Sequence, residues 1–343
     1  MRITRDTLIK AAKTAVQQRT LRDRHIVCVY LTGSLIDDLP LLGGTADIDL
    51  VFVHDNTPPA PREIIRLTPD VHLDLAHHDQ SIYNQPRDLR LDPWVGSFLI
   101  KDPLVLYSTQ HWFEYTQATV FANFYKPDTI LLRAQPFADQ ARQIWLDFQL
   151  GFDEPGPERI WKYLHALELS SNALVLLDGT PLTERRFLLQ FPERMSKLGY
   201  PGMAAGLKDM ILAENPREET IREWMQSWNK TLQIVSTLPN SPVALHPERL
   251  VYYTRAVETL IGDENAAALW IVLRTWTRAI GLLETDSKFY QEWLGCIESL
   301  GLGEHEFKGR LHHLDVYLDQ MEEIIEKWCK QNGIDTNEFN DLR

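Results

Sequence analysis

A glycine-serine turn followed by a pair of aspartates is the part of this sequence whose residue types could do chemistry. Thr32-Gly33-Ser34 ends one apolar run, and Asp47-Ile48-Asp49 begins the next apolar run after twelve intervening residues. A turn of small residues lets backbone N–H groups approach phosphate oxygens, and paired carboxylates can hold divalent metal ions against the same oxygens. The spacing therefore predicts a site for metal-assisted phosphoryl or nucleotidyl transfer.

A third aspartate extends this pattern. Asp74 lies in the alternating segment Val71–Ala76, which is typical of a strand. Asp47 and Asp49 share one face of a strand, with Cα atoms about 6.5–7 Å apart. Mg²⁺ prefers oxygen ligands, so we expect two Mg²⁺ ions on Asp47 and Asp49, with Asp74 completing the second site or taking the acceptor proton. Gly33 and Ser34 would hold the β- and γ-phosphates.

The elements that must position these residues follow from hydrophobic periodicity. Helical spacing predicts a first helix over Thr7–Arg19. The turn Pro58–Pro61 is expected to lead into a short helix. Strands are predicted at His25–Leu31, Asp47–His54, Val71–Ala76 and Leu104–Tyr107, the last after a helix that ends near Lys101.

Beyond about Phe113 the strand signals stop and segments with helical periodicity follow. They cover Asp128–Leu150, Pro157–Leu177, Thr183–Lys197, Gly202–Leu212, Glu218–Leu238, Pro247–Ile261, Glu264–Leu283, Glu284–Leu300 and Glu304–Gln331. We therefore predict an α+β protein with a catalytic α/β domain over residues 1–125. An α-helical bundle or array is expected over residues 126–343, with Lys126-Pro127 at the boundary.

Length, charge and cysteine content limit the function classes. At 343 residues two domains are expected, and a net charge of −13 argues against a large nucleic-acid footprint. The widely spaced Cys28, Cys296 and Cys329 form neither a disulfide framework nor a zinc knuckle. Residues 1–24 lack the apolar core of a signal peptide and no stretch has the length of a membrane span, so we expect a cytoplasmic protein.

Basic residues from the helical half are expected to help bind a triphosphate, because metal ions do not neutralise all of its charge. Lys162 is our prediction, and Arg185-Arg186 is the competitor. On the same helix as Lys162, Glu168 or His165 could act as a general base. His72 alternates in phase with Asp74, so it could flank the metal ions or take part in a zinc site.

Together, Thr32-Gly33-Ser34, Asp47-Ile48-Asp49 and Asp74 resemble the signature of the nucleotidyltransferase superfamily typified by DNA polymerase β. The likeness is to the branch of aminoglycoside, lincosamide and minimal nucleotidyltransferases, and it covers roughly residues 25–110. It implies an α/β domain with a mixed sheet, Mg²⁺ on Asp47 and Asp49, and ATP as the donor. The implied reaction transfers a nucleoside monophosphate to a hydroxyl and releases pyrophosphate. The loop between Ser34 and Asp47 departs from the family pattern by its length.

The acceptor remains open between several classes. A small hydroxylated molecule such as an antibiotic suits the acidic balance of the chain. A protein acceptor is the second possibility, as when a minimal nucleotidyltransferase of toxin–antitoxin type AMPylates its partner. An RNA 3′ end is third and is disfavoured by the net charge. The rival of another class is a catalytically silent nucleotide-binding protein, which would not need three metal-binding carboxylates.

Overall fold

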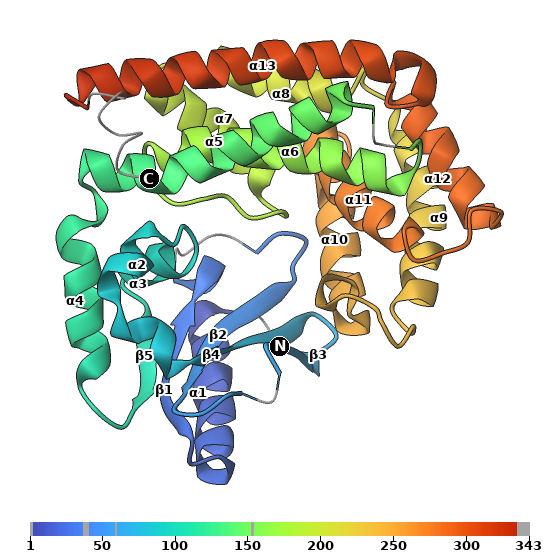
Figure 1. The fold of residues 1–343 in the computed structure, drawn as a ribbon. Helices are drawn as coiled ribbons and strands as arrows, with labels where there is room; N and C mark the ends of the chain where they lie inside the picture. The colour runs from blue at the N-terminus through green and yellow to red at the C-terminus, as the bar shows by residue number, and fades with distance from the viewer. Residues whose placement is uncertain (1–2, 37–40, 59, 152–153, 335–343) are drawn as a thin grey trace. The chain divides into compact units, whose positions relative to one another are not determined.

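The chain has an α+β fold, as predicted, with one mixed sheet in its N-terminal part and helices in the remainder. A computed structural model describes residues 3–36, 41–58, 60–151 and 154–334 (Figure 1). Two compact units are present. One comprises Met1–Thr129 together with His246–Ala256, and the other comprises Ile130–Leu245 together with Val257–Arg343.

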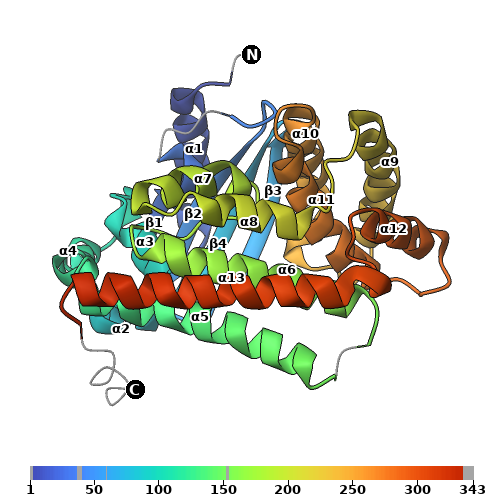
Figure 2. The same cartoon turned by 90° about the horizontal axis from the view of Figure 1, so that it is seen from above.

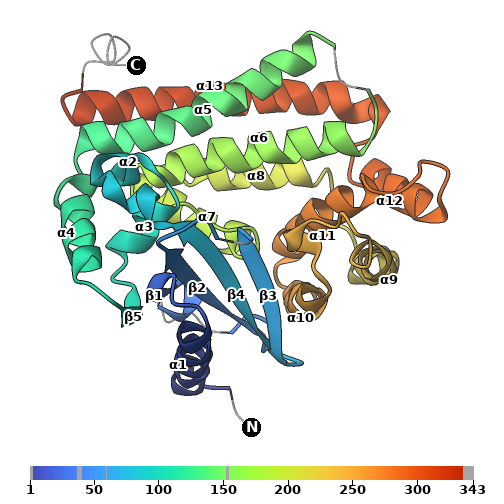
Figure 3. The same cartoon turned by 60° about the horizontal axis from the view of Figure 1, so that its bottom comes forward.

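Five strands form the sheet of the first unit (Figure 3). They are β1 (Ile26–Thr32), β2 (Ala46–His54), β3 (Arg62–Thr68), β4 (Val71–Asp79) and β5 (Leu104–Ser108). Their order is β3-β4-β2-β1-β5, with β2 and β4 parallel and every other neighbouring pair antiparallel. The sheet is therefore mixed, as the resemblance to nucleotidyltransferases implied.

Short helices complete the first unit. They are α1 (Arg5–Arg22), η1 (Gly33–Leu35), η2 (Gln80–Asn84), α2 (Pro86–Leu91), α3 (Val95–Ile100), α4 (Trp112–Phe124), η4 (Pro247–Arg249) and the start of α10 (Leu250–Leu260). The first helix and the strand at residues 104–108 confirm the predictions, whereas α4 was not predicted.

Both faces of the sheet are covered, and the alternation of β2 explains why. Ile48, Leu50 and Phe52 belong to one core cluster, which also contains apolar residues of α1. Val51 and Val53 point to the opposite face and join a cluster with residues of α2, α3 and α4. Side chains alternate along a strand, so Asp47 and Asp49 share a face with Val51 and Val53.

The predicted short helix after Pro58–Pro61 is wrong, because strand β3 follows instead. Arg62 pairs with Ala76 and Ile64 pairs with Asp74 in an antiparallel ladder. Pairing with β4 overrides the weak helical signal and buries Ile64. Pro59 lies outside the described residues, as do residues 37–40 of the long loop before β2.

The second unit consists of helices (Figure 2). They are α5 (Pro127–Gln149), most of which belongs to this unit, α6 (Pro157–Leu176), α7 (Phe187–Leu198), α8 (Gly202–Ile211), α9 (Glu218–Val235), the end of α10, α11 (Asn265–Ile280), α12 (Lys288–Ser299) and α13 (Glu304–Gln331), with η3 (Val243–Leu245). These helices lie where the periodicity predicts them, with ends that differ by a few residues. None of the described helices is long and apolar enough to cross a membrane.

Helix α11 lies at the centre of the second unit, and tryptophans pack around it. Trp228 on α9 donates a hydrogen bond to Thr275, and Trp293 on α12 donates one to Thr277. Both indoles are buried. Buried indole N–H groups need such acceptors, so these tryptophans serve helix packing.

The division into units differs in one respect from a single boundary at residue 125. The first segment of the first unit ends at Thr129, inside α5, a few residues after residue 125. The segment His246–Ala256, however, belongs to the first unit although it follows more than a hundred residues of the second. This returning segment contributes to the site described below.

Candidate metal centre

Strand pairing brings the three aspartates together. In the antiparallel pair β1–β2, Thr32 lies opposite Asp49, and in the parallel pair β2–β4, Asp49 lies opposite Asp74. Asp47 precedes Asp49 by two residues and therefore shares its face. The turn after β1, the start of β2 and the middle of β4 thus converge on one face of the sheet.

The carboxylates of Asp47, Asp49 and Asp74 converge closely enough to share a metal ion. One oxygen from each can be chosen so that all three lie within 4.8 Å of one another. Asp74 is only 2% exposed, and the other two are half-buried. Two like charges 4.8 Å apart repel by about 3.5 kcal/mol at an effective dielectric constant of 20, so the cluster requires positive charge nearby.

The glycine of the turn touches the cluster directly. Gly33 has a φ of +77°, a conformation that favours glycine. A Cβ atom at this position would overlap Oδ2 of Asp49 and lie 2.7 Å from its Cγ. Thr32 ends β1 and Ser34 lies within η1, so the predicted turn adjoins Asp49 as expected.

Two arginines neutralise Asp74. Nε of Arg62 lies 2.5 Å from Oδ1 of Asp74, and Nη2 of Arg62 lies 2.7 Å from Oδ2. Nη2 of Arg249 also donates to Oδ2 of Asp74. The Arg249 side chain is 12% exposed and that of Arg62 is 46% exposed. Both oxygens of this carboxylate therefore accept hydrogen bonds from charged guanidinium groups.

The returning segment contacts a second aspartate as well. The hydroxyl of Tyr252 donates a hydrogen bond of 2.6 Å to Oδ2 of Asp47. The ring of Tyr252 meets the buried His72 edge-on, with 5.1 Å between ring centroids. His72 thus lies near the cluster, as its phase along β4 predicts, and packs against the tyrosine that binds Asp47.

The donor set suits a hard divalent cation. Three carboxylates supply oxygen ligands and three negative charges, of which Arg62 and Arg249 offset two. Mg²⁺ binds oxygen ligands and retains water, whereas zinc sites usually include histidine or cysteine. Among the described residues, the group whose ligand atoms converge in this way consists of aspartates, so Mg²⁺ fits better than zinc.

The predicted triphosphate-binding residue belongs to the second unit. Lys162 lies on α6, where its Nζ is 3.4 Å from Oε1 of Glu158. Its competitors also lie in that unit, with Arg185 buried and Arg186 at the N-cap of α7. A role of these residues in binding phosphate stays a prediction.

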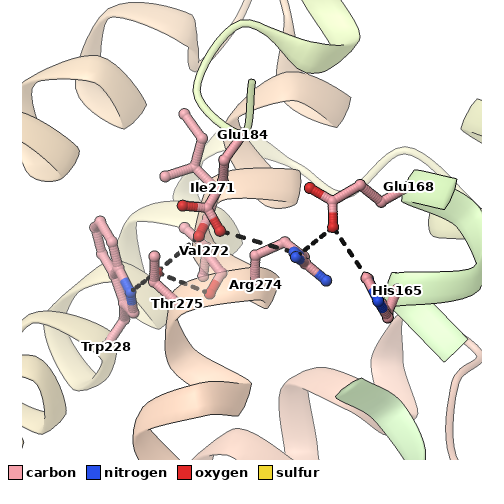
Figure 4. A network of polar contacts seen from close by, with 8 residues as sticks. All are labelled: His165, Glu168, Glu184, Trp228, Ile271, Val272, Arg274 and Thr275. Carbon is pink, nitrogen blue, oxygen red and sulfur yellow. Dashed lines mark hydrogen bonds and ion pairs between the residues drawn. The ribbon is translucent and has the colours of Figure 1, made fainter. Parts of the chain in front are cut away.

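The predicted general bases form part of an ion-pair network inside the second unit (Figure 4). Oε2 of Glu168 lies 2.5 Å from Nη2 of Arg274 and 3.3 Å from Nδ1 of His165. Burial would raise the pKa of Glu168, but the hydrogen bond from His165 and the charge of Arg274 lower it. Glu184 lies 3.7 Å from Nε of Arg274. A lowered pKa makes Glu168 a weaker base, and a role of Glu168 or His165 as general base stays a prediction.

Three other histidines of the first unit, His54, His77 and His78, contact one another or a tyrosine. Nε2 of His54 lies 2.9 Å from Nδ1 of His77, and Nδ1 of His78 lies 2.8 Å from the hydroxyl of Tyr83. Burial lowers the pKa of each of these histidines. They are neutral near pH 7 and lie on β2 and β4.

Sequence reasoning missed Arg62, Arg249 and Tyr252. The β-branched pair Ile64-Ile65 is a weak strand signal near Arg62, but the pairing with β4 that brings Arg62 to Asp74 depends on the fold. Arg249 and Tyr252 carry no local signal, because they reach the aspartates only through the fold. Arg249 lies 175 residues beyond Asp74 in the chain.

No protein-family model matches the chain, and a search of curated proteins returns no match. Function is therefore inferred from the residues of the site and their geometry.

Proposed function

We propose that this chain is a Mg²⁺-dependent nucleotidyltransferase that moves a nucleoside monophosphate, AMP from ATP, to a hydroxyl group. The observation that carries the proposal is the convergence of Asp47, Asp49 and Asp74 beside the Gly33 turn. A binding site for a neutral ligand has no need of three adjoining carboxylates, since their mutual repulsion destabilises the fold. The resemblance of the same residues to the nucleotidyltransferase signature supports the assignment.

The residues of the cluster have distinct parts in this reaction. Asp47 and Asp49 would hold two Mg²⁺ ions, with Asp74 as a further ligand of one of them. When bound, these ions would neutralise the triphosphate and lower the pKa of the acceptor hydroxyl. Backbone N–H groups at Gly33 and Ser34 would bind the outer phosphates.

The bond changes are those of an in-line displacement. The acceptor oxygen forms a bond to the α-phosphorus while the bond to the bridging oxygen of the β-phosphate breaks. Pyrophosphate leaves with the electron pair of that bond. The hydroxyl proton would pass to a carboxylate of the cluster or to solvent, and Asp74 could take it only after Arg62 and Arg249 release that carboxylate.

A small hydroxylated molecule is our proposal for the acceptor. The net charge of −13 favours a neutral or cationic compound over an RNA 3′ end. Transfer to a protein hydroxyl is the second candidate, because the same carboxylates and turn would serve it equally. Nothing in the cluster itself selects one acceptor over the other.

Pyrophosphate release tests the proposal. Purified protein is incubated with ATP, Mg²⁺ and a panel of hydroxylated small molecules and protein fractions. We expect release with at least one acceptor, and a loss on the order of 10²-fold or more in Asp47→Asn and Asp49→Asn, because each removes charge at the metal ions. Asp88→Asn is the matched control, since it makes the same change at an exposed aspartate on α2.

Equal pyrophosphate traces from the wild type and both cluster variants would contradict the proposal. Folding of each variant is checked by thermal unfolding, so that a lost activity is not mistaken for a lost fold. Product analysis by mass then separates transfer from hydrolysis, because transfer to an acceptor adds the mass of AMP to it.

A further inference from the structure

We propose that Arg62 and Arg249 are exchangeable counter-ions. They bind Asp74 when no divalent metal is present, and they move to the polyphosphate when metal takes Asp74. The inference rests on the proposed function and deepens it, because it assigns the phosphate-binding cations of the same site. It gives these two arginines the phosphate-binding role that the sequence predicted for Lys162, with Arg185-Arg186 as the alternative.

The arginines and a metal ion would compete for the same carboxylate oxygens of Asp74. Arg62 donates to both oxygens of Asp74, and Arg249 donates to Oδ2. A metal ion that uses Asp74 as a ligand must take a lone pair that now accepts one of these hydrogen bonds. Binding of metal at Asp74 therefore weakens or opens at least one arginine contact.

The net charge of the cluster also favours the exchange. Three carboxylates and two guanidinium groups leave a net charge of −1 at the cluster. Two divalent ions would reverse that sign, and the arginines would then be repelled from a carboxylate that is already neutralised. A bound triphosphate brings the negative charge that offsets this excess, so the arginines gain a new partner at the time when they lose the old one.

The guanidinium group of an arginine can bind a carboxylate or a phosphate in the same way. The guanidinium fork of Arg62 already binds a carboxylate with two parallel hydrogen bonds, and the same fork matches two oxygens of a phosphate. Arg62 is 46% exposed and can reorient without breaking a packed core. Arg249 is 12% exposed and is fixed in η4, so it can move only a short distance.

The returning segment links this exchange to Asp47. Arg249 in η4 holds Asp74, and Tyr252 at the start of α10 holds Asp47. Metal ligation by both aspartates would disturb both contacts of this segment within the first unit. Metal binding would therefore release this segment at two points, Arg249 and Tyr252.

A fixed structural clamp is the alternative. In that case the arginines stay on Asp74 in every state, and removing one would change the affinity for metal without changing the affinity for triphosphate. Exchange predicts opposite effects on the two affinities. Loss of a competing cation strengthens metal binding, whereas loss of a phosphate ligand weakens triphosphate binding.

Two titrations test the inference in Arg249→Gln and Arg62→Gln. Mn²⁺ alone is titrated by water-proton relaxation, and a non-hydrolysable ATP analogue is titrated by calorimetry with Mg²⁺ in excess. We expect the affinity for Mn²⁺ to rise about threefold or more, and the affinity for the analogue to fall about tenfold. Arg255→Gln is the control, because Arg255 lies in the same segment, pairs with Asp70 at 3.5 Å and carries the same charge.

The possible outcomes separate the two proposals. If wild-type protein binds no Mn²⁺, the proposed function fails and the exchange fails with it. If the wild type binds Mn²⁺ and the analogue, but Arg249→Gln and Arg62→Gln match Arg255→Gln in both titrations, the exchange alone is overturned. An unchanged affinity for the analogue beside a raised affinity for Mn²⁺ also overturns it, in favour of the fixed clamp. The exposed Arg62 variant keeps the test valid if Arg249→Gln does not fold.

Discussion

The contact between Gly33 and Asp49 shows how far a single residue determines this site. The positive φ of Gly33 and the overlap that any Cβ atom would have with Asp49 both require glycine. The turn can therefore approach a carboxylate and, in the proposed reaction, a metal-bound phosphate. The same requirement makes this position sensitive to the smallest possible substitution.

Gly33→Ala should damage the site more than the fold. The added methyl group must displace the Asp49 carboxylate or shift the turn, and the left-handed backbone adds about 1 kcal/mol of strain. We expect a modest fall in melting temperature together with at least a tenfold loss of affinity for Mn²⁺. Gly44→Ala is the control, because Gly44 also has a positive φ but no atom lies within 4 Å of its added Cβ.

Both variants are compared by thermal unfolding and by Mn²⁺ titration. Equal losses of metal affinity in Gly33→Ala and Gly44→Ala would mean that backbone strain, and not the contact with Asp49, explains the result.

At the residue scale the sequence identifies the three aspartates of the cluster, but it does not identify the arginines that bind Asp74. Asp47 and Asp49 are recognisable because one strand places residues i and i+2 on the same face. Asp74 is recognisable because it alternates with apolar residues. Arg62 was missed through a wrong prediction of the element that carries it, and Arg249 was missed because its contact depends on the fold of the whole unit.

At the scale of helices and strands, the aspartate cluster depends on the parallel pairing of β2 with β4. It places Asp49 opposite Asp74 in register, and β3 then completes the edge and supplies Arg62. Apolar alternation predicts β2 and β4, and short apolar runs predict β1 and β5. Neither pattern predicts which strands are neighbours, since pairing depends on contacts between distant segments.

A chain of hydrogen bonds joins three of these elements on the face opposite α1. The hydroxyls of Tyr30 on β1 and Tyr83 on η2 lie 2.8 Å apart, and the Tyr83 hydroxyl lies 2.8 Å from Nδ1 of His78 on β4. Burial lowers the pKa of His78 to about 4. Nδ1 of a neutral imidazole can accept a hydrogen bond from the Tyr83 hydroxyl, whereas a protonated imidazole has no free lone pair to accept it.

Stability of the first unit should therefore fall as the pH falls from about 6.5 towards 4. The unfolded chain binds a proton at His78 near pH 6.5, and the folded chain does so only near pH 4. The unfolded state thus holds more protons across this window, and stability is complete above it. His78 is partly exposed, so we expect its contribution to be about 1–2 kcal/mol, with His54 and His77 acting in the same direction.

Urea unfolding of the wild type and His78→Gln across this pH range checks the expectation. The difference in stability between the two proteins should shrink as the pH is lowered, because only the wild type loses the neutral imidazole. A difference that stays constant from pH 7 to pH 4.5 would show that His78 does not titrate with folding.

At the scale of the whole molecule, the first unit is assembled from both parts of the chain. Its sheet comes from the N-terminal residues, and its segment His246–Ala256 returns after most of the helices. Composition and periodicity predict the change from strands to helices near residue 125. They do not predict the return, because a helix that follows another helix has the same local pattern in either unit.

Because of the returning segment, the site depends on residues that lie far beyond the strands in the chain. Arg249 and Tyr252 contact Asp74 and Asp47, so a fragment that ended near residue 129 would lack a buried counter-ion of the cluster. The buried Asp74 would then lose one of its two cationic partners, which is costly for a charge in that environment. Experiments on the site therefore require a chain that includes His246–Ala256.

Metal binding by the three aspartates is the central claim, and one titration tests it most directly. Mn²⁺ is added to the full-length wild type, to Asp47→Asn/Asp49→Asn and to Asp88→Asn while water-proton relaxation is recorded. The geometry of the cluster predicts saturable binding to the wild type and Asp88→Asn, and a loss of at least tenfold in affinity in the double variant. Indistinguishable curves for all three proteins would contradict the claim.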